Sequence, residues 1–104
     1  KCKAYIAKNL NKELNLDTLA DQLHLNPSYL SSVFSKHEGV PLKRYIIQQR
    51  LLAAQNMLIY SDYTISEIAT HLGFNSQSYF GMLFRKNFGV TPSSYRAQNI
   101  VIKQ

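Results

Sequence analysis

The fold is decided by the stretch NSQSYFGMLFRKNFGVTPSSYR, residues 75–96, because an earlier part of the chain repeats it. That earlier part is NPSYLSSVFSKHEGVPLKRY, residues 26–45, and the two align when one residue is inserted after Asn75. A solenoid needs about three or more copies of its repeat. Two copies therefore predict a tandem pair of helical units instead.

The apolar residues that precede the second copy are spaced as in an amphipathic helix. Ile65, Ile68, Ala69 and Leu72 fall at i, i+3, i+4 and i+7, and the same pattern begins at Leu16 before the first copy. Apolar and polar residues do not alternate over any useful length, as strands would require. We therefore predict an all-α fold of about seven helices, at residues 2–11, 16–24, 27–37, 42–60, 65–72, 76–87 and 92–98.

Residues that favour helix starts support these boundaries. Thr64 and Glu67 form a capping-box sequence, in which each side chain can accept a hydrogen bond from the main-chain N–H of the other residue. Other residues with N-cap preferences stand before four more of the predicted helices. These signals are Asn15, Asn26 followed by Pro27, Asn75-Ser76, and Thr91 followed by Pro92.

Each unit is expected to be a helix, a tight turn and a second helix. Gly73 stands where the turn of the second unit needs a positive φ, and His24 stands at the same place in the first unit. Histidine tolerates a positive φ better than branched residues do, at some cost in energy. Gly39 and Gly89 are expected to end the second helices in the left-handed conformation.

The helix predicted at residues 42–60 is the longest and would span roughly 28 Å. We predict that it links a first helix-turn-helix subdomain, residues 1–41, to a second subdomain, residues 61–104. Apolar residues on two of its faces would let it take part in both cores. One face carries Ile47, Leu51, Ala54 and Leu58, and the other carries Tyr45, Leu52 and Ile59.

The chain of 104 residues is basic, with a net charge of +6 and a pI near 9.6. This charge favours a polyanionic partner, although a solvated basic face would give the same numbers. The single cysteine, Cys2, excludes a disulfide framework and a cysteine-based zinc site. His24, His37 and His71 have no neighbours at metal-ligand spacing, and no catalytic motif is present. We expect no enzyme activity, no metal and no cofactor.

No apolar run reaches membrane-spanning length and no signal peptide is visible, so we expect a cytoplasmic protein without a membrane partner. The chain begins Lys-Cys-Lys rather than with Met, which favours a fragment of a longer protein. We expect the fragment to be monomeric. A sensing or dimerising domain before Lys1 would allow the full-length protein to dimerise.

Two segments resemble the DNA-binding domain of AraC-type bacterial transcription regulators. ISEIATHLGFNSQSYFGMLFRKNFGVTPSSYR, residues 65–96, is similar to the C-terminal signature of that family, and YIIQQRLLAAQNMLI, residues 45–59, is similar to its linking helix. The resemblance covers about residues 3–98. It implies sequence-specific binding of double-stranded DNA, with contact to RNA polymerase as a further implied property.

A single chain of this family carries both of the helices that a dimer of other helix-turn-helix proteins would supply. Those dimers read half-sites about 34 Å apart. We therefore expect two reader helices, at about residues 27–37 and 76–87, to enter successive major grooves. The alternative is a basic helical protein-interaction module, which would expose Leu, Ile or Met in a groove rather than basic residues along the reader helices.

The family pattern places base contacts on exposed positions near the starts of both reader helices. Gln77 is the strongest candidate, since its amide can bond adenine N6 and N7 together. Asn75 has the alternative of a plain N-cap, and serines in a first helical turn can simply be solvated. The full set is Ser28, Ser31 and Ser32 in the first unit, and Asn75, Gln77, Ser78 and Met82 in the second.

Many family members carry Arg at the positions of Ser32 and Met82. Arginine is the usual bidentate reader of guanine, so we predict a weak guanine preference at these positions and more reliance on A·T contacts and DNA shape. Tyr29, Tyr79, Phe34 and Phe84 lie at core spacing, and we expect them to pack in the interior.

Phosphate contacts should position the domain and supply much of its affinity. Lys36 and Lys86 hold matching positions late in the two reader helices, which favours a shared role. Each basic residue has the alternative of an ordinary solvated charge, and Arg50 has that of a structural residue between the units. The candidates for phosphate contact are Lys36, Arg50, Arg85, Lys86 and Arg96.

Overall fold

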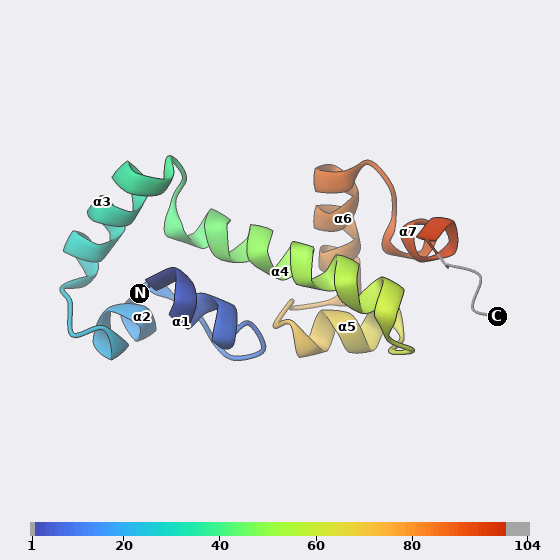
Figure 1. Ribbon diagram of the computed structural model, residues 1–104, viewed down its shortest axis with the longest axis horizontal. Coiled ribbons are helices and arrows are strands. Elements are labelled where there is room, and N and C mark those ends of the chain that lie inside the picture. Colours follow the sequence, from blue (N-terminus) through green and yellow to red (C-terminus); the bar gives the residue numbers. More distant parts are fainter. Residues whose placement is uncertain (1, 100–104) are drawn as a thin grey trace. The chain divides into compact units, whose positions relative to one another are not determined.

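A computed structural model describes residues 2–99 of the chain and confirms an all-α fold in that range. Residue 1 and residues 100–104, which belong to the predicted subdomains 1–41 and 61–104, lie outside the described residues. Figure 1 shows the helices in chain order. They are α1 (Cys2–Lys8), α2 (Leu16–Gln22), α3 (Pro27–Glu38), α4 (Leu42–Tyr60), α5 (Ile65–His71), α6 (Gln77–Phe88) and α7 (Pro92–Asn99).

The chain divides into two compact units, Lys1–Arg50 and Leu51–Gln104. The boundary falls inside α4, so each unit takes about half of that helix. The three-part division into residues 1–41, 42–60 and 61–104 stays a prediction. Each unit contains one pair of helices joined by a tight turn, α2 with α3 and α5 with α6.

The core of the first unit is formed by residues that the helical spacing brings to one side of each helix. Its buried members come from α1, α2, α3 and the start of α4, and half-buried residues such as Tyr45 pack against them. The rings of Phe34 and Tyr45 meet edge-on, with centroids 5.1 Å apart. The buried set is Ile6, Leu19, Ala20, Leu30, Phe34, Leu42 and Ile46.

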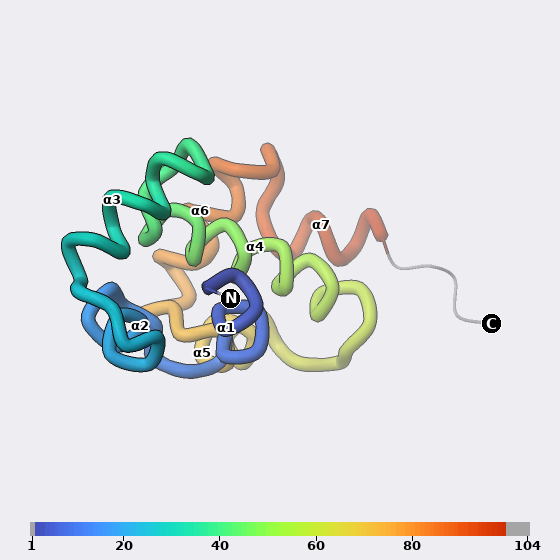
Figure 2. The backbone as a smooth tube through the Cα atoms, turned by 60° about the vertical axis from the view of Figure 1, so that its left-hand side comes forward, coloured from blue at the N-terminus to red at the C-terminus, as the bar shows by residue number. Residues whose placement is uncertain are grey.

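The second unit has a more aromatic interior. Phe80 and Phe84 of α6 are fully buried, and their ring centroids lie 5.8 Å apart. Phe84 also packs edge-on against Phe88 and against Tyr95 of α7, at 4.7 and 5.5 Å. Figure 2 shows the short connection that brings the chain from α6 into α7. These edge-to-face pairs fix the reader helix α6 by aromatic packing as well as by burial.

The turns of the two units have the same hydrogen-bonded geometry. His24 has φ of 58° and Gly73 has φ of 80°, as the sequence predicted. Directly after each turn residue, the N–H of Leu25 donates to the Ala20 carbonyl at 2.8 Å and that of Phe74 donates to the Ala69 carbonyl at 2.9 Å. The first unit therefore keeps the turn without the glycine, at the cost of a left-handed histidine.

The helix caps confirm most of the predicted start signals and correct one. Thr64 and Glu67 form the capping box, with hydrogen bonds of 2.8 and 3.0 Å. The cap of α6 is Ser76, whose hydroxyl accepts from the N–H of Tyr79 at 3.0 Å, so the alternative of Asn75 as a plain N-cap is wrong. Ser76 therefore corresponds to the cap residue Asn26 of α3, and Asn75 is the extra residue of the second turn.

Two further expectations need correction. The predicted helix 2–11 ends at Lys8, because Asn9 turns its side chain back to the Tyr5 carbonyl at 2.8 Å. The second apolar face predicted for residues 42–60 is wrong at Leu52, which is 47% exposed. Instead, the buried residues of α4 change along its length: Leu42 and Ile46 lie in the first unit, and Leu51, Ala54 and Leu58 in the second.

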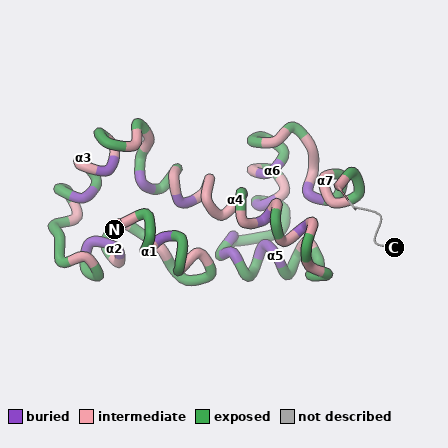
Figure 3. Tube along the Cα trace, viewed as in Figure 1, coloured by how far each residue is buried: buried purple, intermediate pink, exposed green. Residues whose placement is uncertain are grey.

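Figure 3 shows that buried positions recur at intervals along the helices rather than in runs. This pattern leaves every helix with an exposed side. In the part of the chain that the structure describes, no helix combines the length and the apolar character needed to cross a membrane.

Candidate nucleic-acid interface

The exposed side of α6 carries the polar and basic candidates of the second unit. Phe80 and Phe84 turn one side of this helix into the core. The other side presents a short polar start and a basic end, because Arg85 and Lys86 occupy its last turn. The predicted residues brought together on this helix, all exposed, are Gln77, Ser78, Met82, Arg85 and Lys86.

The exposed side of α3 is built from smaller residues. Leu30 and Phe34 face the core, and Ser28, Ser31 and Ser32 are exposed. Lys36 is exposed near the end of this helix. The structure therefore places all predicted base-contacting residues of the first unit at the surface of one helix.

Asn75 lies outside α6, in the turn, and is exposed. Because Ser76 caps the helix, the side chain of Asn75 is not needed for that purpose. An exposed amide directly before a reader helix is available to an approaching ligand, which keeps the prediction for Asn75 open.

The tyrosines at the starts of the reader helices are more exposed than the spacing predicts. Phe34 and Phe84 are buried as predicted, but Tyr29 is 59% exposed and Tyr79 is 37% exposed. Both tyrosines lie one position before a core residue, which places them at the border of the buried side. The expectation of interior packing is therefore wrong for the two tyrosines.

Arg50 and Arg96 are held by main-chain carbonyl groups. Arg50 donates from Nε to Leu10 at 3.2 Å and from a terminal nitrogen to Lys12 at 2.7 Å. Its partners lie within the first unit, just after α1. Arg50 therefore has a structural role inside the first unit, and the predicted alternative of a role between the two units is wrong.

Arg96 makes the matching pair of bonds in the second unit. Its Nε donates to the Leu58 carbonyl at 2.9 Å and its terminal nitrogen donates to Ser61 at 3.3 Å. Arg96 thus satisfies carbonyl groups at and just after the end of α4, whereas Arg50 satisfies carbonyl groups in the turns that follow α1. The sequence signal for this role was weak, because donor and acceptors lie 35 to 40 positions apart.

Burial lowers the pKa of Arg50 from its ordinary value, but an arginine stays charged at neutral pH. At the surface of the same unit, Lys3 pairs with Glu38 at 2.8 Å. The hydrogen bond with Glu38 raises the pKa of Lys3. Lys36, in the same last turn of α3 as Glu38, is an exposed cation of the reader helix.

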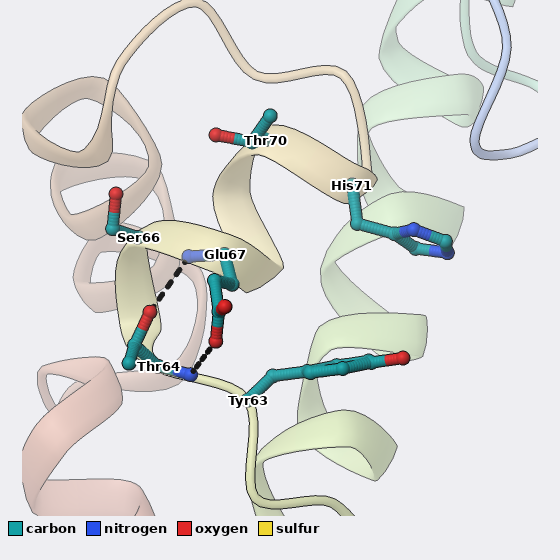
Figure 4. A pocket seen from close by; sticks show the side chains of 6 residues that line it. All are labelled: Tyr63, Thr64, Ser66, Glu67, Thr70 and His71. Carbon is teal, nitrogen blue, oxygen red and sulfur yellow. Dashed lines mark hydrogen bonds between the residues drawn. The ribbon is translucent and has the colours of Figure 1, made fainter.

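An open hollow of about 490 Å³ lies beside α5 in the second unit. Figure 4 shows that the cap of α5 forms much of its wall, with Thr64 and Glu67 bonded to each other's main chain. The rings of Tyr63 and His71 close one side, with centroids 6.4 Å apart. The helix cap therefore accounts for Thr64 and Glu67 in this hollow, and Ser66, Thr70 and His71 supply its other polar side chains. No group of three or more possible metal ligands occurs among residues 2–99.

Two residues, the N-cap of α6 and one residue inside this helix, were not identified from the sequence. Ser76 is the N-cap in place of Asn75, and the signal for it was its residue type, since serine is as good an N-cap as asparagine. Gly81 was not considered, although it aligns with the exposed Ser31 of α3.

Comparisons with known proteins agree with this arrangement. The family model described as "Helix-turn-helix domain" matches residues 19–98. The regulatory protein PocR of Salmonella typhimurium is 38% identical over 94% of this chain, which spans only 32% of that protein.

Two solved structures extend the likeness to the fold. The C-terminal domain of AraT, a response regulator from Geobacillus stearothermophilus, has a TM-score of 0.91 at 29% identity, over 98% of this chain and 85% of that one. The DNA-binding domain of AdpA, a global transcriptional factor solved in complex with a target DNA, has a TM-score of 0.87 at 30% identity, over 93% and 87%. The chain therefore belongs to the family of AraC-type helix-turn-helix domains.

Proposed function

We propose that this chain binds double-stranded DNA sequence-specifically, as the DNA-binding domain of a transcription regulator. The reader helices α3 and α6 enter successive major grooves in this proposal. The observation that carries it is the exposed, polar side of each reader helix, together with the likeness to a domain solved on its target DNA. A helix fits the major groove with the residues of its first turns against the base edges.

Base reading falls mainly to the second unit. Gln77 has an amide for adenine, and Met82, which is 56% exposed, has an apolar end for a thymine methyl. Ser78 and the serines of α3 can donate or accept, so they discriminate less between bases. The proposed base contacts remain Ser28, Ser31, Ser32, Asn75, Gln77, Ser78 and Met82.

Phosphate contacts are proposed first for the exposed cations Lys36, Arg85 and Lys86. Arg50 and Arg96 already use two donors each for carbonyl groups. A guanidinium has five N–H donors, so a phosphate contact by the remaining ones is a secondary role for these two residues.

Salt dependence tests the proposal directly. The chain is titrated with a labelled random-sequence duplex at several salt concentrations, and log K is plotted against log salt. Each neutralised phosphate contributes about −0.9 to the slope, so we expect a slope of roughly −4 or steeper. Lys86→Ala should flatten the slope by about one, and the control Lys8→Ala, on the exposed side of α1, should leave it unchanged.

The absence of binding at low salt would contradict the proposal and favour the basic protein-interaction module. The same samples test the oligomeric state, since sedimentation of the free chain should give a monomer. Contact with RNA polymerase stays a prediction, to be tested by co-sedimentation of polymerase with the chain bound to its selected DNA.

A further inference from the structure

Gly81 lies in the interior of the reader helix α6. It is the fifth residue of the twelve in α6. Glycine destabilises a helix relative to alanine, because the unfolded chain has more backbone freedom to lose. A glycine at such a position therefore needs a reason.

The usual reasons do not apply to Gly81. Three glycines stand in turns or helix caps and have positive φ values: Gly39, Gly73 and Gly89. Gly81, in contrast, has an ordinary helical conformation. A Cβ at Gly81 would meet nothing within 4 Å outside its own helical backbone, in the described part of the chain. Neither the backbone conformation nor the packing within the described residues therefore requires a glycine at position 81.

The neighbours of Gly81 belong to the proposed DNA-facing side of α6. Gln77 and Ser78 lie one turn before it, Arg85 lies one turn after it, and all three are exposed. In the first unit the matching position is the exposed Ser31. The glycine therefore leaves a gap in the middle of a polar and basic surface.

We propose that Gly81 is the point at which the main chain of α6 comes closest to the DNA. Ser78 has a short side chain and Met82 carries no charged group that could reach a base from a distance, so base contact requires the helix to lie deep in the groove. A side chain at position 81 would hold the helix away from the base edges. This inference rests on the proposed DNA-binding function.

The substitution Gly81→Ala separates stability from binding. Alanine fits the free chain, so the melting temperature should rise by about 2–8 °C. Affinity for a duplex selected from a random pool by the wild-type chain should fall by about fivefold or more, as expected when a methyl group is forced into a closely packed contact. Gly81→Leu should lose more affinity than Gly81→Ala, since the side chain is larger.

Asn87→Ala is the matched control. Asn87 is exposed in the last turn of α6 and donates to the Leu83 carbonyl at 2.8 Å. Alanine removes this bond and raises helix propensity there, and it adds no bulk near Gly81. It should bind the selected duplex as the wild type does. The inference would be overturned if Asn87→Ala lost as much affinity as Gly81→Ala. It would also be overturned if the alanine and leucine variants of Gly81 lost affinity equally. In either case a stiffer helix, and not side-chain bulk at position 81, would explain the loss of affinity.

Unchanged affinity of Gly81→Ala, with the wild type binding normally, would also overturn the inference and leave the DNA-binding proposal intact. A wild-type chain that binds no duplex at low salt would remove both. The two failures are therefore distinguishable in one series of titrations.

Discussion

The Nε of Arg96 donates a hydrogen bond of 2.9 Å to the main-chain carbonyl of Leu58, which lies 38 positions earlier in the chain. The last carbonyl groups of α4 have no partner within that helix. Arg96 supplies one, and its positive charge also lies at the negative end of the helix dipole. In this way α7 holds the C-terminal end of α4, which precedes α5 in the chain.

Removing this arginine should destabilise the second unit. We expect Arg96→Ala to lower the free energy of unfolding by about 1.5–3 kcal/mol, because it leaves part-buried carbonyl groups without a charged donor. Urea unfolding measures the loss. Arg85→Ala, which removes an exposed arginine of α6, is the control and should change stability by less than about 0.5 kcal/mol.

Arg50→Ala should have the same effect on the first unit. Amide hydrogen exchange can assign each loss to its unit: protection should fall in α2 and α3 for Arg50→Ala, and in α5 and α6 for Arg96→Ala. Uniform loss of protection in both units, from either variant, would contradict the separate roles of the two arginines.

Replacing the left-handed turn residue of the first unit, His24, should increase thermal stability. His24 has φ of 58°, a conformation that costs a side-chain-bearing residue about 1–2 kcal/mol. His24→Gly should therefore raise the melting temperature, by less than this cost because glycine also stabilises the unfolded state. In the second unit, Gly73→Ala should lower it, since its φ is 80°. A thermal scan that gave the opposite signs would refute this account of the turns.

The capping box of α5 should contribute to stability. Thr64→Ala removes the acceptor for the Glu67 N–H at 3.0 Å and should cost about 1 kcal/mol in chemical denaturation. Thr70→Ala replaces an exposed threonine on the same helix that takes no part in the cap, so it serves as the control. Equal loss in both variants would contradict the capping account, because alanine favours a helix more than threonine does and should not destabilise α5 at position 70.

Base and phosphate contacts should differ in their response to sequence. Gln77→Ala should relax specificity at one base pair, at a cost of about 1–3 kcal/mol on the selected duplex and little on random DNA. Lys86→Ala should weaken binding to both duplexes to a similar extent. Equal weakening on both duplexes by Gln77→Ala would show that its amide does not read a base.

An arginine can be introduced at position 82 to test whether this position reads a base. Met82 is exposed on α6, so Met82→Arg is expected to leave the fold unchanged and to introduce a guanine preference at one position. Selection from a random DNA pool measures the preference, with Met82→Gln as an uncharged control of similar length. An unchanged consensus for Met82→Arg would place position 82 outside reach of the bases.

The sequence alone determined which segments are helical, most of the caps and the turns, because these depend on residues close together in the chain. The spacing from Ile65 to Leu72 identified α5, and Thr64 with Glu67 identified its start. His24 was recognised as the turn residue from its alignment with Gly73. Helix spacing and capping are local properties, so one sequence suffices for them.

The tertiary structure alone decided what the surface residues can do. From the sequence, Arg96 was a solvated or phosphate-binding cation, and Arg50 had the further alternative of a structural residue between the units. The structure gave both arginines their distant carbonyl partners. Tyr29 has core spacing but lies exposed at the border of the buried side. Only the space around Gly81 showed that nothing in the described chain requires a glycine there. Exposure and long-range hydrogen bonds depend on how helices pack against one another, and local sequence patterns do not contain that information.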